Sequence, residues 1–174
     1  MTPIAARIPA FLSVCGLGAG VLAYIYSFLF EPADKIWGWA VVALVPLWMA
    51  LLLPMIVLEY PQSRSVSFSF SGFARGAPSW VAPFSWLLSL IFVAHFIWMA
   101  VHNGPGVPAI VNGQYALDSR GRILKILTQA EYLSLTRGEF RAFATIMVYF
   151  YFVTTTYWWF RASRLQSEKP SVRR

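Results

Sequence analysis

Two histidines, His95 and His102, are the side chains of this chain best suited to bind a cofactor. They lie seven residues apart in "FVAHFIWMAVH", which places them on about the same face of a helix. Paired histidines can hold haem in a membrane protein, but the two axial ligands of one haem usually come from different helices. The chain has 2 histidines in all, so we expect no cofactor within one chain. A haem or metal shared by an assembly stays open.

Helix packing gives these histidines a simpler role. Polar side chains of membrane helices commonly form hydrogen bonds across to a neighbouring helix. We therefore expect His95 to be a neutral imidazole hydrogen-bonded between helices, and His102 to be an interface residue.

The remaining reactive side chains form no catalytic pattern. No G-x-S-x-G, H-E-x-x-H, Walker or C-x-x-C motif occurs, and Cys15 is the only cysteine. The acidic residues show neither paired-carboxylate spacing nor metal-ligand spacing with a histidine: Glu31, Asp34, Glu59, Asp118, Glu131, Glu139 and Glu168. The sequence therefore predicts that the protein is not an enzyme and has no metal site of its own.

The composition is that of an integral membrane protein. Hydrophobic residues make up 58% of the chain and charged residues 12%, whereas roughly a quarter of the residues in a soluble domain are charged. The net charge of +7 comes from basic residues at the ends of apolar runs and in the C-terminal tail. This distribution is typical of membrane proteins, so we expect contact with membrane lipids and no binding of nucleic acid.

The elements that would position these residues are apolar helices. About 20 apolar residues cross a bilayer, and four segments qualify: about 11–30, 37–58, 81–101 and 142–160. We expect an all-α membrane protein, a four-transmembrane-helix bundle forming a single integral membrane domain over 1–174. No Asp, Glu, Lys or Arg lies within these segments, which disfavours a pump or a proton-coupled transporter.

Basic residues near the segment ends predict the topology. With both termini on the cytoplasmic side, eight of the 14 basic residues lie inside and six outside. An excess of Lys and Arg marks the cytoplasmic side. We therefore expect a multi-pass protein with both termini cytoplasmic.

The first apolar segment contains a helix-packing motif. In "CGLGAG", Gly16 and Gly20 form G-x-x-x-G, and Gly18 widens the patch of small residues. Small residues one turn apart let two membrane helices approach closely. The approaching helix belongs either to the same chain, which we favour, or to a partner protein or another copy in an oligomer.

Two loops carry β-sheet patterns. In "SRSVSFSFSGF", Ser65, Ser67, Ser69 and Ser71 alternate with apolar residues, which predicts a strand. The outer loop, 102–141, begins with an extended lead-in and continues with "QYALDSRGRILKIL". This second stretch predicts a small extramembrane β-hairpin, 114–127, between the third and fourth helices. Thr128 and Glu131 match a capping box, which predicts a helix start at 129.

Three basic residues of this hairpin, Arg120, Arg122 and Lys125, are its candidates for contact with a partner. The alternative, which we favour, is that they form a solvated or lipid-facing basic edge. The hairpin is too small to be stable alone, so we expect it to rest on the membrane surface, on the helix ends or on a partner.

This layout resembles the immunity proteins against pore-forming toxins of the colicin A type. The resemblance covers about Gln114 to Arg164, with the outer hairpin, the aromatic segment "YFYFVTTTYWWF" and a basic tail. It implies a protein of the bacterial inner membrane that recognises the toxin's membrane-inserted helices by helix–helix contact. The alternative is an accessory or assembly subunit of a larger respiratory, transport or secretion complex, and a small-molecule transporter comes third.

Overall fold

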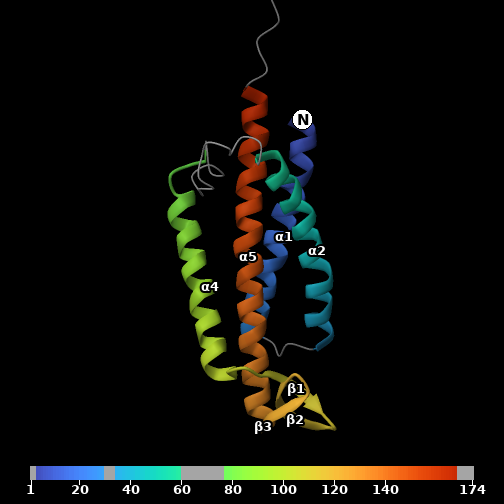
Figure 1. Ribbon diagram of the computed structural model, residues 1–174. Helices are drawn as coiled ribbons and strands as arrows, with labels where there is room; N and C mark the ends of the chain where they lie inside the picture. Colours follow the sequence, from blue (N-terminus) through green and yellow to red (C-terminus); the bar gives the residue numbers. More distant parts are fainter. Residues whose placement is uncertain (1–2, 30–33, 60–76, 168–174) are drawn as a thin grey trace, which may run out of the picture.

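The computed structural model describes residues 3–29, 34–59 and 77–167, which form four helices and a three-stranded sheet (Figure 1). The helices are α1 (Pro3–Leu29), α2 (Asp34–Glu59), α4 (Val81–Asn103) and α5 (Gln129–Ser167). The strands are β1 (Val107–Val111), β2 (Gln114–Ser119) and β3 (Arg122–Ile126). The serine-alternating segment predicted as a strand lies outside the described residues.

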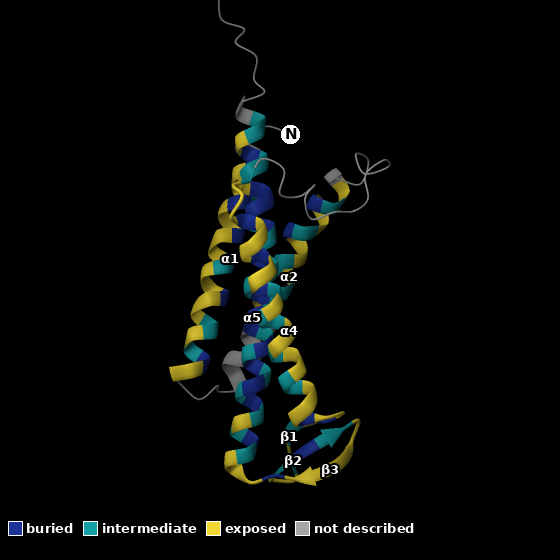
Figure 2. Ribbon diagram, turned by 90° about the vertical axis from the view of Figure 1, so that its left-hand side faces the viewer, coloured by how far each residue is buried: buried dark blue, intermediate teal, exposed yellow. Residues whose placement is uncertain are grey.

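Helix α5 is the central element of the bundle. It is 39 residues long, and α1, α2 and α4 lie around it (Figure 1). The start of α1 and the end of α5 lie at one end of the bundle, and the sheet lies at the other. Buried and half-buried residues predominate along α5, whereas much of α1 and α4 is exposed (Figure 2). The core therefore consists of several hydrophobic clusters that follow one another along α5.

The predicted four-transmembrane-helix bundle is wrong. Among the described residues, two helices are long and apolar enough to cross a membrane, Ala6–Leu29 with 24 residues and Val81–Asn103 with 23. The apolar part of α2 within the described residues, Ala43–Val57, is shorter. Tyrosine, tryptophan and threonine replace aliphatic residues over much of α5, and their polar groups lower its hydropathy although many of them are buried.

The β-structure between α4 and α5 also differs from the prediction, because it is an antiparallel sheet of order β1-β2-β3 instead of a two-stranded hairpin. The predicted lead-in supplies β1, which pairs with β2 from Val107↔Asp118 to Val111↔Gln114. The turn between them is Asn112-Gly113, with φ values of 52° and 79°. Asn-Gly between two strands is the strongest sequence signal for a hairpin turn, so this strand was predictable.

A second two-residue turn joins β2 to β3. Arg120 and Gly121 have φ values of 55° and 84°, and Ser119 pairs with Arg122 across the turn. The backbone N–H of Gly121 donates to the Asp118 carboxylate at 3.2 Å. Glycine takes this left-handed conformation without strain, which explains how so short a turn closes here.

The start of α5 is fixed by the capping box that its sequence predicts. The backbone N–H of Glu131 donates to Thr128 Oγ1 at 3.2 Å, and the backbone N–H of Thr128 donates to the Glu131 carboxylate at 2.8 Å. Lys125 Nζ also donates to that carboxylate, at 2.7 Å. Lys125 first, then Thr128, lower the pKa of Glu131 to about 2. These bonds tie β3 to the first turn of α5.

Candidate functional site

The glycine motif of α1 packs against α5 of the same chain. A Cβ atom added at Gly16 would overlap the ring of Tyr151, and one added at Gly20 would lie 3.3 Å from Val148 Cγ2. A Cβ added at Gly18 would meet nothing within 4 Å. Gly16 and Gly20 therefore serve the interior of the bundle, and Gly18 lies on the outer face of α1.

Two aromatic residues of α5 hold α2 by hydrogen bonds to its backbone. The Tyr151 hydroxyl donates to the carbonyl of Leu44 at 2.7 Å, and Trp158 Nε1 donates to the carbonyl of Leu51 at 3.2 Å. Both side chains are buried. From the first hydrogen bond to the second, the residue number rises by seven on α5 and by seven on α2. The two helices therefore run parallel.

Among the described residues, helix α4 packs chiefly against α5, and most of its circumference is uncovered. Its buried residues are Val81, Ser85, Leu88 and Asn103. Only 6% of its apolar segment is buried within the structure. The remaining faces carry large apolar side chains at least half exposed, among them Trp86, Leu87, Leu90, Phe96, Ile97 and Val101. We call this set the α4 outer face.

His95 and His102 lie on α4, and each binds its own helix. Nδ1 of His95 donates to the carbonyl of Ile91 at 2.9 Å, and Nδ1 of His102 donates to the carbonyl of Trp98 at 2.8 Å. The hydrogen bond predicted between helices for His95 therefore lies within α4, because the carbonyl one turn back is within reach. The contact of His95 with α1 is a ring contact with Tyr24, with centroids 5.8 Å apart.

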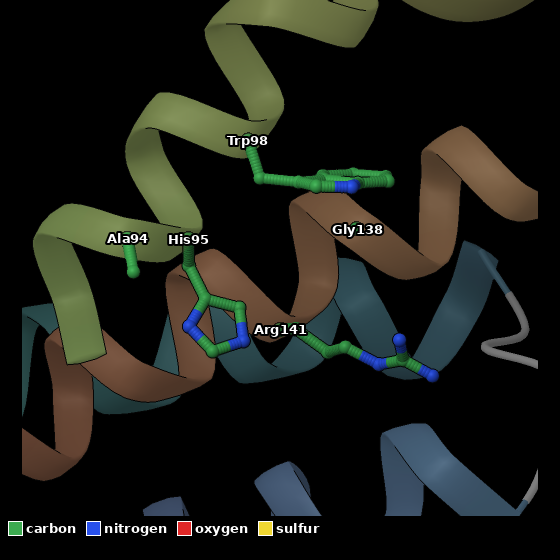
Figure 3. A pocket seen from close by; sticks show the side chains of 5 residues that line it. All are labelled: Ala94, His95, Trp98, Gly138 and Arg141. Atoms are coloured by element: carbon green, nitrogen blue, oxygen red, sulfur yellow. The ribbon is translucent and has the colours of Figure 1, made fainter.

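A pocket of about 260 Å³ lies between α4 and α5, lined by Ala94, His95, Trp98, Gly138 and Arg141 (Figure 3). The Trp98 indole covers Gly138, where a Cβ atom would overlap the ring. The His95 imidazole extends from α4 towards the Arg141 side chain on α5. The absence of a side chain at Gly138 therefore makes room for the indole on α5.

Arg141 connects this pocket to the end of α1. Its Nη2 donates to the carbonyl of Ser27 at 3.3 Å, and its guanidinium carbon lies 4.2 Å from the centre of the Phe28 ring. Its Nε is buried and has no hydrogen-bond partner among the described residues. A guanidinium near the last carbonyls of a helix interacts favourably with the negative end of the helix dipole.

A buried polar pair joins the end of α4 to α5. Asn103 is 3% exposed, and its Nδ2 donates to the Glu139 carboxylate at 2.9 Å. Oδ1 of Asn103 is buried without a partner among the described residues. Burial raises the pKa of Glu139 to about 7, against the lowering effect of the Asn103 hydrogen bond. The carboxyl group therefore titrates near neutral pH.

The three basic residues predicted for partner contact have different surroundings in the structure. Arg120 lies in the turn and Arg122 on β3, and both are exposed. Lys125 forms the ion pair with Glu131 and lines a second pocket, of about 280 Å³, together with His102. Arg120 and Arg122 therefore stay available to a partner, and Lys125 has a structural role.

Sequence reasoning missed Arg141 and Asn103 as site residues. Arg141 was only counted among the basic residues that predict the topology. It follows Gly138 by three residues and so lies on the same helix face. The role of Asn103 could not be predicted from the sequence, because its hydrogen-bond partner Glu139 lies 36 residues away.

Neither the described side chains nor the comparisons point to a known cofactor or family. Among the described residues, no group of three or more His, Cys, Asp or Glu side chains is placed to hold a metal ion. No protein-family model, curated protein or solved structure matches the chain.

Proposed function

We propose that the protein acts in a membrane by binding another membrane protein along the α4 outer face. Val81–Asn103 is long and apolar enough to cross a membrane. Most of its large apolar side chains remain exposed in the part of the chain that the structure describes. The observation that carries this proposal is the contrast between a well-packed α5 and a largely uncovered α4 (Figure 2).

The chemistry of the α4 outer face suits recognition by shape. Its members are tryptophan, phenylalanine, leucine, isoleucine and valine, with no charged residue among them. In lipid, helices associate by van der Waals packing and a few hydrogen bonds, since the acyl chains offer no hydrophobic drive. Large rigid side chains such as Trp86 supply most of the binding energy in many interfaces. The partner is therefore proposed to be an apolar helix that packs beside α4.

The topology and the membrane are part of the same proposal. Both termini are proposed to lie on the cytoplasmic side of a bacterial inner membrane. The basic C-terminal tail supports this orientation, and so does the position of α1's start and α5's end at one end of the bundle. The sheet then lies on the opposite side, where Arg120 and Arg122 would contribute to partner contact.

The narrower hypothesis that the partner is a pore-forming toxin rests on the resemblance of Gln114–Arg164 to the immunity proteins. A strain that lacks the gene should be killed by one toxin, and the gene should restore protection. Recovery of a stoichiometric complex from native membranes in the absence of any toxin would instead establish the accessory subunit.

Co-purification with matched variants tests partner binding itself. Leu90 on α4 is 64% exposed and Leu22 on α1 is 69% exposed, so alanine at either site removes a similar exposed side chain. We expect Leu90→Ala to reduce the partner recovered in mild detergent at least fivefold, and Leu22→Ala to leave it unchanged. Equal recovery with both variants would contradict binding along α4.

A further inference from the structure

We propose that the pocket between α4 and α5 binds the phosphate group of a phospholipid, with Arg141 as its main ligand. This site is separate from the α4 outer face and does not depend on the identity of a protein partner. The argument rests on the charge of Arg141, its level along the bundle and the walls of the pocket.

The guanidinium of Arg141 has no anionic partner within the described residues. Within the described part of the chain, its guanidinium donates one hydrogen bond, to the neutral carbonyl of Ser27 at 3.3 Å, which is longer than most such bonds. Glu139, the nearest acidic residue along α5, accepts its hydrogen bond from Asn103. A guanidinium offers five N–H donors in a planar fork that matches phosphate oxygens. An anion in the pocket would complete this donor set.

Arg141 lies at the level where phospholipid phosphates are expected. It contacts Ser27 and Phe28, in the last turn of the apolar segment Ala6–Leu29 that is long enough to cross a membrane. Headgroups begin where such a segment ends. Trp98 and Tyr24, which both contact this region, are residue types that concentrate at the headgroup level.

The walls of the pocket favour a lipid over a small soluble ion. A volume of about 260 Å³ exceeds the space that one phosphate group needs and leaves room for part of a headgroup. Nδ1 of His95 donates to the Ile91 carbonyl, so Nε2 is the ring nitrogen that can accept a hydrogen bond from a headgroup hydroxyl or ammonium. Phe28, whose ring lies against the Arg141 guanidinium, is 57% exposed and offers apolar surface to acyl chains.

Binding is tested on the purified full-length protein by native mass spectrometry after delipidation. Phosphatidylglycerol is compared with diacylglycerol of the same acyl chains, which lacks the phosphate, and with inorganic phosphate. We expect one phosphatidylglycerol to bind and diacylglycerol to fail. Inorganic phosphate should compete only weakly, because it lacks the acyl contacts. Binding of inorganic phosphate without phosphatidylglycerol would overturn the lipid as the source of the phosphate.

Two matched variants assign the site. Arg141→Gln and Arg122→Gln each remove one positive charge, but Arg122 lies on the exposed strand β3. We expect Arg141→Gln to weaken phosphatidylglycerol binding at least tenfold and Arg122→Gln to leave it unchanged. Equal affinity of both variants would overturn the proposal.

A measurement on the wild-type chain covers the case in which Arg141→Gln does not fold. Phosphatidylglycerol with a photoreactive headgroup should label the peptides that contain 94–98 and 138–141. Labelling confined to other peptides would contradict the site.

Discussion

Gly16→Ala and Gly18→Ala form a matched pair that tests how α1 packs on α5. Both glycines lie in the middle of α1, and the two variants add the same methyl group. At Gly16 the new Cβ would overlap the ring of Tyr151, which is 0% exposed and has little room to move. At Gly18 the new Cβ would meet nothing within 4 Å.

The two substitutions should change the free energy of unfolding in different directions. Alanine favours a helix over glycine by about 0.5–1 kcal/mol, so Gly18→Ala should be neutral or slightly stabilising. Displacement of the Tyr151 ring in Gly16→Ala costs about 1–3 kcal/mol for overpacking. Loss of the Tyr151 hydrogen bond to Leu44, 2.7 Å long, costs about 1 kcal/mol more. The two variants should therefore differ by about 2–4 kcal/mol.

Reversible unfolding in mixed micelles, followed by circular dichroism, measures this difference. Cys15→Ala serves as an additional control because Cys15 is exposed. If the free energies of unfolding of Gly16→Ala and Gly18→Ala lie within about 0.5 kcal/mol of each other, α1 does not approach Tyr151 as closely as the structure shows.

Three further predictions concern the polar contacts of the bundle. Because burial raises the pKa of Glu139 from 4.5 to about 7, the folded state favours the protonated carboxyl. The free energy of unfolding should therefore be highest below about pH 4.5 and fall between about pH 4.5 and 7, by about 2 kcal/mol once solvent screening of the half-buried carboxyl is allowed for. Glu139→Gln should abolish this slope in pH-dependent unfolding, and an unchanged slope would exclude Glu139 as its source. Thr128→Ala removes the N-cap of α5 and should cost about 1 kcal/mol in the same assay; a variant as stable as the wild type would argue against the cap. Trp158→Phe removes the donor to the Leu51 carbonyl and should cost about 1–2 kcal/mol, whereas Trp159→Phe, at an exposed residue, should cost almost nothing.

Local features of the fold were predictable because their causes are adjacent in the chain. The Thr128–Glu131 capping box and the left-handed Gly121 each depend on residues three or fewer positions apart. The strand β1 was missed although Asn112-Gly113 marks its turn, because the prolines and glycines before it suggested only an extended segment. A more complete use of turn signals would have found it.

Features that join distant segments could not be predicted in this way. The contact of Arg141 with Ser27 spans 114 residues of sequence, and no pattern within either segment announces it. The segment 142–160 was predicted to cross the membrane because its aromatic residues were counted with aliphatic ones. In α5 many of those residues are buried against the other helices, where Tyr151 and Trp158 also use their polar groups as hydrogen-bond donors.

Site-specific photo-crosslinking in native membranes tests partner binding along α4 most directly. A photoreactive amino acid is placed at Ile97 on α4 or, as a control, at Ile8 on α1; these side chains are 56% and 61% exposed. We predict one discrete protein adduct from Ile97 and none from Ile8. Adducts with lipid alone at both positions, or the same protein adduct from both, would contradict a specific partner on the α4 outer face.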